Sequence, residues 1–367
     1  MQVPFVDLKA QYRGIKNDID NAIGNVISKT AFIGGEYVKE FEKQFSELYG
    51  VKHVISCGNG TDSLYIIMKM LGIGVGDEVI TAANSWISSS ETISQTGAKP
   101  VFTDPDNMYM SMSSQAVAKA ITDATKAVIV VHLHGQVCDM EGILKLCADK
   151  SIHVIEDCAQ SHFSEYGDKR AGVMGIAGSF SFYPGKNLGA YGDAGCIITN
   201  DDALAEKCRM YANHGALKKH HHEIEGINSR MDGLQAAVLS VKLQYILNWT
   251  EQRIANAALY NKHLQGVDDI ILPVVRPDTK HSFHLYMIRA RRRNELQQYL
   301  KAKGVETAIH YPTALPNLPA YKYLGVNSID FPVATKLQDE ILSLPMYPEL
   351  NEECIRYIAD CIRSFYQ

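Results

Sequence analysis

A lysine lies in a glycine-rich turn between two apolar runs, where its amine could act as a nucleophile. The first run ends in Phe182-Tyr183, Pro184-Gly185 turns the backbone, and Lys186 follows, ahead of several glycines and a second apolar run. Partial burial there would lower the pKa of the amine and make it reactive. A lysine that contacts a phosphate, or one on the surface, fits the same pattern.

A carboxylate stands where an earlier apolar run stops. Asp157 follows His153-Val154-Ile155-Glu156. An isolated aspartate in such a place is commonly a helix N-cap or a turn residue. A carboxylate is also what pyridoxal phosphate requires, because it keeps the pyridine nitrogen protonated so that the ring withdraws electrons from the reacting carbon. A candidate cofactor lysine further along the chain favours this second interpretation.

A third group, Gly58-Asn59-Gly60-Thr61, falls between a predicted strand and a predicted helix. Glycines let the backbone approach a ligand, and the first amides of a helix offer unpaired donors at the positive end of its dipole. This arrangement suits a phosphate. It lacks the G-K-[ST] ending of a Walker loop and is not G-x-G-x-x-G, so it is a weak signal when taken alone.

The elements that must position these groups alternate between strands and helices. Predicted strands are His53–Ser56, Glu78–Thr81, Pro100–Phe102, Ala127–His132, His153–Glu156, Ser179–Phe182 and Gly195–Thr199, and helices between them include Thr61–Leu71 and Met140–Lys150. This alternation predicts an α/β fold with a large, mostly parallel sheet covered by helices on both faces. Polar residues gather just after the strands, where such sheets bind ligands.

The pattern changes in the second half of the chain. Met231–Trp249 reads as one long apolar helix that Glu251–Gln265 continues. A second alternation follows, with a strand at Ser282–Ala290, a helix at Arg293–Lys303 and a strand at Val305–His310. We therefore predict a large domain over residues 1–245 and a smaller C-terminal α/β domain over 246–367.

Composition narrows the class of protein. A net charge of -5 argues against an electrostatic nucleic-acid footprint. The 8 cysteines form no C-x-x-C pair and no zinc-binding spacing, so we expect reduced thiols and no metal site. The N-terminus does not resemble a signal peptide, and no apolar run is long enough to cross a membrane. We expect a cytoplasmic protein.

Taken together, the motifs resemble those of the DegT/DnrJ/EryC1/StrS sugar aminotransferases, a fold-type-I branch of the pyridoxal-phosphate enzymes. The resemblance extends over nearly the whole chain and rests on many ordered motifs. They are Pro4–Leu8, Gly58–Asp62, Glu156–Ser161, Phe182–Gly189, Asn228–Asp232, His310–Pro312 and Ser343–Met346.

The resemblance implies roles for individual residues. Lys186 would hold the cofactor covalently and then move a proton between the sugar carbon and the cofactor, while Asp157 would pair with the pyridinium nitrogen. Other cofactor contacts would come from Gly60, Thr61 and Ser181 on the phosphate, Trp86 stacked on the ring and Gln160 near the ring hydroxyl. Asn228 would reach the phosphate in the neighbouring subunit of a homodimer with shared active sites. Arg230, His310 and Tyr311 would meet the nucleotide-sugar.

Each of several roles has a structural alternative. Trp86 also suits a core aromatic, Ser181 an ordinary strand residue, and His310 a histidine satisfied by local hydrogen bonds. One residue departs from the family pattern, because His134 stands where relatives often carry tyrosine.

The resemblance also predicts the reaction. Family members with histidine in place of the lysine are sugar dehydratases, so Lys186 favours transamination, with L-glutamate as the amino donor in a ping-pong scheme. The sequence after the lysine, Asn187 to Asp193, resembles that of members that aminate C3 of dTDP-3-keto-6-deoxyhexoses, for O-antigen or other glycans. A UDP-linked 3-keto-N-acetylglucosaminuronate, a 4-keto sugar, and a non-catalytic ligand-binding regulator are the alternatives.

Overall fold

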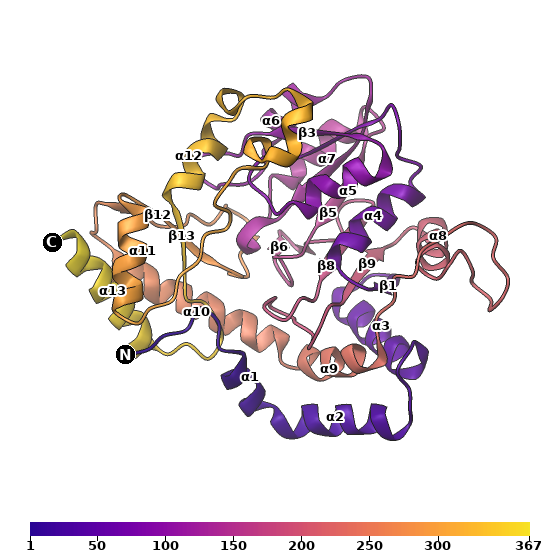
Figure 1. The fold of residues 1–367 in the computed structure, drawn as a ribbon, viewed down its shortest axis with the longest axis horizontal. Coiled ribbons are helices and arrows are strands. Elements are labelled where there is room, and N and C mark those ends of the chain that lie inside the picture. The colour runs from indigo at the N-terminus through magenta and orange to yellow at the C-terminus, as the bar shows by residue number, and fades with distance from the viewer.

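The computed structural model describes residues 1–367 and is built around a seven-stranded sheet (Figure 1). In spatial order its strands are β1 (His53–Cys57), β9 (Gly195–Thr199), β8 (Ala177–Ser181), β5 (His153–Asp157), β4 (Thr125–Val131), β2 (Glu78–Ala82) and β3 (Lys99–Thr103). All neighbours pair in parallel except β9, which runs antiparallel to both β1 and β8. The predicted α/β class with a mostly parallel sheet is confirmed.

The strands form from short, β-branched apolar runs that are buried on both faces. In β4, every residue except Lys126 is buried, and β9 is buried throughout. Continuous apolar runs are the expected sequence of strands covered on both sides by helices, because neither face meets water.

Helices cover this sheet. Those of the N-terminal segment are α1 (Leu8–Gly14), α2 (Lys16–Ser28) and α3 (Gly35–Tyr49), and those that follow strands are α4 (Gly60–Met70), α5 (Ser88–Thr96), α6 (Ser114–Ala120), α7 (Met140–Ala148) and α8 (Asp202–Ala212). α4 packs between α5 and α8, while α2 and α3 pack against α9 (Gly233–Leu243), as Figure 1 shows. One apolar core unites the sheet with these helices.

The single helix predicted over 231–249 is wrong, because the chain breaks between α9 and α10 (Ile246–Leu264). The amides of Gln244 and Tyr245 donate three residues back, to Val241 and Lys242, and this tighter turn redirects the axis. Apolar residues occupy both sides of the break, with Leu243 and Ile246 both buried. An apolar pattern that continues through a turn cannot reveal it.

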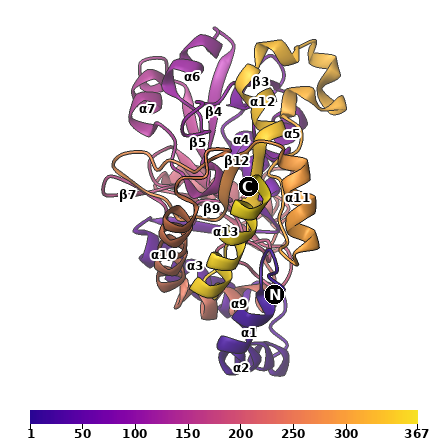
Figure 2. The ribbon, with the colours of Figure 1, turned by 90° about the vertical axis from the view of Figure 1, so that its left-hand side faces the viewer.

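The C-terminal part has its own three-stranded antiparallel sheet of β10 (Ile270–Ile271), β12 (Tyr286–Ala290) and β13 (Ile341–Leu344). α11 (Arg293–Ala302) packs on this sheet, and α13 (Glu352–Tyr366) packs against α10 and α11 (Figure 2). A second apolar cluster lies among them. Apart from Val3, its buried residues begin within α10, so we keep the boundary near residue 245 as a proposal.

Two predicted strands of this part differ from the structure. The strand predicted at 282–290 begins only at Tyr286. The strand predicted at 305–310 is absent: Val305 and Ala308 form isolated bridges to Val3 and Ser343. The strand that pairs with β12 is β13.

The remaining elements join the two parts. β6 (Glu165–Tyr166) and β7 (Lys169–Arg170) form a small sheet with β11 (Thr279–Lys280). α12 (Pro332–Glu340) contacts β12 and lies beside the large sheet in Figure 1, and the amides of Val333 and Ala334 at its start donate to the Asp104 carboxylate. No helix of the structure combines the length and the apolar character needed to cross a membrane.

Candidate active site

The candidate residues converge at the carboxyl-end edge of the large sheet. Asp157 is the last residue of β5 and Ser181 the last of β8, while Trp86 and His134 lie in the segments after β2 and β4. Because parallel strands end at the same edge, residues far apart in sequence meet there, as in other open α/β sheets.

Lys186 lies in the loop between the antiparallel neighbours β8 and β9. The loop is closed by two bonds of 2.7 Å, from the amide of Phe182 to the carbonyl of Ala194 and from the amide of Ala190 to the carbonyl of Phe182. Burial lowers the pKa of the Lys186 amine from 10.5 to about 8, and the nearby Asp157 carboxylate opposes this shift. The amine is therefore close to losing its proton near neutral pH.

Asp157 is buried, with 7% of its surface exposed, and its Oδ1 accepts a 3.1 Å bond from the amide of Ala159. Burial raises the pKa of the carboxyl, while that hydrogen bond and the Lys186 ammonium oppose the shift. A buried carboxylate with free acceptor capacity is suited to a cationic partner.

The strand beneath Asp157 is anchored by its neighbour Glu156. The Glu156 carboxylate lies 3.0 Å from Nε2 of His132 and accepts three backbone amides, from Gly172, Met174 and Gly175. The group His132, Glu156 and Cys158 has metal-ligating atoms within reach of one another. These hydrogen bonds already engage the Glu156 oxygens, so we assign this cluster a structural role.

The turn into α4 contains Gly60 and Thr61, which the sequence predicts to bind a phosphate. Asn59 caps the helix through a 2.8 Å bond from the amide of Asp62, and no acceptor in the chain takes the amides of Gly60 or Thr61. A Cβ on Gly60 would lie 2.7 Å from Cβ of Ser181, so only glycine allows this approach. The turn brings two free donors and the Ser181 hydroxyl to one place.

Gln160, Tyr311 and Trp86 form a cluster of contacting side chains. Gln160 donates from Nε2 to the hydroxyl of Tyr311 over 2.9 Å, and its Oε1 accepts the amide of His134 over 2.8 Å. The Trp86 ring lies 5.4 Å from that of Tyr311 and is 57% exposed, which leaves a face open for stacking. The structural alternative of a core position does not hold for Trp86.

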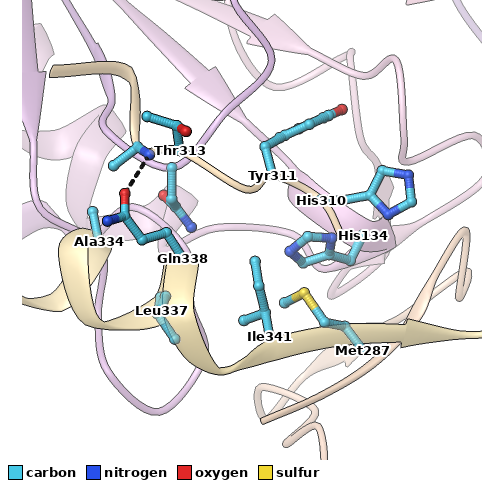
Figure 3. Close-up of a pocket in the computed structure, with 11 residues that line it drawn as sticks. His134, Met287, His310, Tyr311, Thr313, Ala334, Leu337, Gln338 and Ile341 are labelled. Atoms are coloured by element: carbon cyan, nitrogen blue, oxygen red, sulfur yellow. Dashed lines mark hydrogen bonds between the residues drawn. The ribbon is translucent and has the colours of Figure 1, made fainter. Parts of the chain in front are cut away.

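His310 lies next to Tyr311 in a small pocket between the two parts of the chain (Figure 3). Its Nδ1 is 2.9 Å from the hydroxyl of Ser343, so the structural role of a satisfied histidine is realised. His134 faces the same pocket above Met287 and Ile341, and burial lowers its pKa to about 3. Its buried Nδ1 has no partner in the chain.

Asn228 and Arg230 are exposed, and the structure does not place their side chains against Lys186 or Asp157. Ser229 between them accepts the amide of Gly58 over 2.9 Å and donates to the Asp62 carboxylate over 2.6 Å. This segment therefore adjoins the phosphate turn. The prediction that Asn228 serves a neighbouring subunit stays a prediction.

The sequence did not indicate which residues hold the lysine loop in place. Asn187 contacts His284 and Ser282 of the C-terminal part, while Gln235 and Lys242 of α9 bind the loop at Tyr191 and Gly189. Asn187 belonged to a recognised motif and could have been singled out. Its partners lie far away in sequence and carried no local signal.

These residues fit pyridoxal phosphate. The free amides of Gly60 and Thr61 suit the phosphate, the buried Asp157 suits a protonated ring nitrogen, and Lys186 suits the carbonyl. Gly60 supports this fit independently, because a side chain there would close the cradle.

Comparison with known proteins agrees with this geometry. Residues 13–363 match the DegT/DnrJ/EryC1/StrS aminotransferase family. The chain is 44% identical to a pleiotropic regulatory protein of Geobacillus stearothermophilus, covering 100% of this chain and 99% of the relative. It is 39% identical to dTDP-3-amino-3,6-dideoxy-alpha-D-galactopyranose transaminase of Aneurinibacillus thermoaerophilus, covering 99% of each. It is 40% identical to UDP-2-acetamido-2-deoxy-3-oxo-D-glucuronate aminotransferase of Pseudomonas aeruginosa, covering 99% and 100%.

Among solved structures, S. venezuelae DesV in complex with a ketimine intermediate has a TM-score of 0.97 with this chain. The two are 38% identical, and the match covers 100% of this chain and 99% of the other.

Proposed function

This chain belongs to the DegT/DnrJ/EryC1/StrS aminotransferase family and is a pyridoxal-phosphate-dependent sugar aminotransferase, and we propose that it aminates C3 of a nucleotide-linked keto-sugar with L-glutamate as the amino donor. The preferred substrate is a dTDP-3-keto-6-deoxyhexose, and the product is the dTDP-3-amino-3,6-dideoxyhexose for O-antigen or other glycan synthesis.

One observation carries the catalytic assignment: the Lys186 amine, with its pKa near 8, lies close to the buried Asp157 carboxylate at the edge of the sheet. When bound, pyridoxal phosphate supplies an electron sink for the reacting carbon. Nζ of Lys186 moves a proton between the sugar carbon and the cofactor. Such a positioned proton transfer typically contributes about 10²- to 10⁴-fold in rate. Asp157 holds the proton on the ring nitrogen.

The other residues of the site bind and orient the cofactor and the nucleotide-sugar. The amides of Gly60 and Thr61 and the hydroxyl of Ser181 hold the phosphate, and Trp86 stacks on the ring. Gln160 orients Tyr311 through its 2.9 Å bond and would lie near the ring hydroxyl of the bound cofactor. Asn228 acts in the partner site of a homodimer, and Arg230, His310 and Tyr311 meet the nucleotide-sugar.

The loop after the lysine supports the assignment to C3 in an indirect way. Residues Asn187–Ala190 are buried, and a Cβ on Gly192 would lie 2.8 Å from Nε2 of Gln235. The sequence Asn187–Asp193 therefore specifies the path of the loop backbone. That path determines which positions the Lys186 amine can reach. The relatives that make 3-amino sugars include both dTDP and UDP enzymes, so the UDP-linked 3-keto-uronate is the second candidate.

A regulator without catalytic activity is the competing function from another class. The name of one relative, a pleiotropic regulatory protein, is the observation that favours this alternative. Loss of the lysine or the aspartate would be its signature, and this chain keeps both Lys186 and Asp157. We therefore propose the enzyme.

Two measurements test the proposal. Protein incubated with pyridoxal phosphate should turn yellow, and borohydride should fix the cofactor to Lys186 and not to the variant Lys186→Ala. Colourless wild-type protein would overturn the enzyme assignment. Turnover of dTDP- and UDP-linked 3-keto sugars with glutamate, against a 4-keto sugar, tests the substrate. Activity on the 4-keto sugar alone would overturn amination at C3.

A further inference from the structure

Asn187, which directly follows Lys186, is bound to the C-terminal part of the chain. Its side chain is 3% exposed. Its Nδ2 donates to the carbonyl of Ser282 over 3.3 Å, and its Oδ1 lies 3.1 Å from Nδ1 of His284. Ser282 and His284 precede β12, so this contact joins the lysine loop to the other part of the molecule.

The chemistry of the pair fixes which atom carries the proton. Because the Asn187 nitrogen faces a carbonyl, its other terminal atom is an oxygen that can only accept. Nδ1 of His284 therefore donates. Burial, the Lys186 ammonium and the Arg253 guanidinium lower the pKa of His284 well below its ordinary value, so the ring is neutral.

His284 is itself held in place. The Arg253 guanidinium, buried in α10, donates from Nη1 to the carbonyl of Phe283 over 3.2 Å, of His284 over 3.4 Å and of Met346 over 2.9 Å. Three carbonyls around one guanidinium tie this segment to the C-terminal part. The imidazole that reaches Asn187 thus has a fixed backbone.

We propose that His284 is a positioning residue for the reaction: its Nδ1–H bond to Asn187 sets the position of Lys186 and makes it depend on the placement of the C-terminal part. The inference rests on the proposed function, in which Lys186 moves the proton. Without the bond, the buried Asn187 amide loses one partner and the backbone at Lys186 can shift. A misplacement of about 1 Å can cost about 10²-fold in rate.

The test uses four single-site variants and the double variant His284→Ala/Asn187→Ala, all in the full-length protein loaded with pyridoxal phosphate. His284→Ala and Asn187→Ala remove the two partners. His284→Asn restores a donor, since the asparagine amide nitrogen occupies the place of Nδ1. His281→Asn is the matched control, because His281 lies in the same segment and binds the amide of Phe283 and not the loop.

Two readouts separate positioning from general damage. We expect kcat to fall about 10- to 100-fold in His284→Ala and in Asn187→Ala, with little change in KM. The double variant should be no slower than either single one, because both remove the same bond. Hydrogen exchange should rise at the amides of Lys186 and Ala190 and not across the sheet, and His284→Asn should recover most of the rate and the protection.

Two results would overturn the inference. One is His284→Ala with the kcat and exchange of the His281→Asn control, and the other is His284→Asn as impaired as His284→Ala. If His284→Ala does not fold, Asn187→Ala with the exchange measurement gives the same decision. Wild-type protein without aminotransferase activity would instead count against the proposed function, while the exchange pattern would still decide whether the bond holds the loop.

Discussion

Nζ of Lys242 lies 2.6 Å from the carbonyl oxygen of Gly189 and 4.3 Å from the centroid of the Tyr191 ring. Lys242 is fully buried in α9, and no carboxylate lies within ion-pair distance of it. The ammonium therefore supports the far end of the loop that carries Lys186. With His284 at the near end, the loop is held from two separate parts of the chain.

Lys242 should make stability depend on pH. Burial lowers its pKa from 10.5 to about 8. Below pH 8, the folded and unfolded chains both bind the proton; between pH 8 and 10.5 the unfolded chain binds more, so the free energy of unfolding gains a contribution that rises with pH. In urea unfolding, the free energy of unfolding of wild type relative to Lys242→Met should increase from pH 8 to pH 10.5. Lys39→Met, at an exposed position, is the control, and a difference between wild type and Lys242→Met that stays constant over this range would contradict the prediction.

Replacing Lys186 should abolish amination. Lys186→Arg keeps a positive charge but not a titratable amine, and Lys186→Ala removes both, so each should lower kcat by about 10²- to 10⁴-fold or more. The measurement is amino transfer from glutamate to a 3-keto sugar nucleotide. Lys39→Arg, an exposed position, serves as the control. An active Lys186→Arg enzyme would show that another base moves the proton.

Capture of the cofactor should report the pKa of Lys186. The rate at which cofactor-free protein binds pyridoxal phosphate covalently should rise with pH around a midpoint of about 8, because only the neutral amine reacts. The Asp157 carboxylate raises that pKa, so Asp157→Asn should move the midpoint lower. Free Nα-acetyl-lysine, which keeps its side-chain amine, corrects for ionisation of the cofactor under the same conditions. A midpoint that moves upward in the variant would refute the electrostatic assignment.

Gly60→Ala should weaken cofactor binding. The added Cβ would meet Cβ of Ser181 at 2.7 Å, and the shift needed to relieve this overlap would displace the amides and the hydroxyl proposed to bind the phosphate. We expect about a 10- to 100-fold loss of affinity, which corresponds to about 1.4–2.8 kcal/mol. Equilibrium dialysis of pyridoxal phosphate measures this loss. Gly24→Ala is the control, because its Cβ meets nothing within 4 Å, and it should stabilise α2 by up to about 1 kcal/mol. Equal affinity in the two variants would count against a close-fitting cradle.

Much of this architecture could be predicted because its signals are local. Strands such as β5 and β9 are short apolar runs, and Asp157 and Gly60 stand at strand ends where ligand-binding residues gather. These patterns identify each element without knowledge of its neighbours.

The predictions fail where contacts between segments distant in sequence determine the structure. Residues 305–310 are extended but pair only through isolated bridges, because β13 takes the adjacent position in the sheet. The support of Lys186 by His284 and Lys242 depends on contacts between segments about a hundred and about fifty residues apart. A single sequence contains no local pattern for such contacts.

The antiparallel pairing of β8 with β9 makes the lysine loop a hairpin whose two ends are fixed side by side. We therefore expect that residues 182–194 can be replaced by the corresponding loop of a relative without a change in the order of the strands. The residues that contact the loop must be transferred together with it. If Gln235, Lys242 and His284 are not transferred as well, the new protein has the sequence Asn187–Asp193 but lacks the contacts that fix the path of the loop backbone.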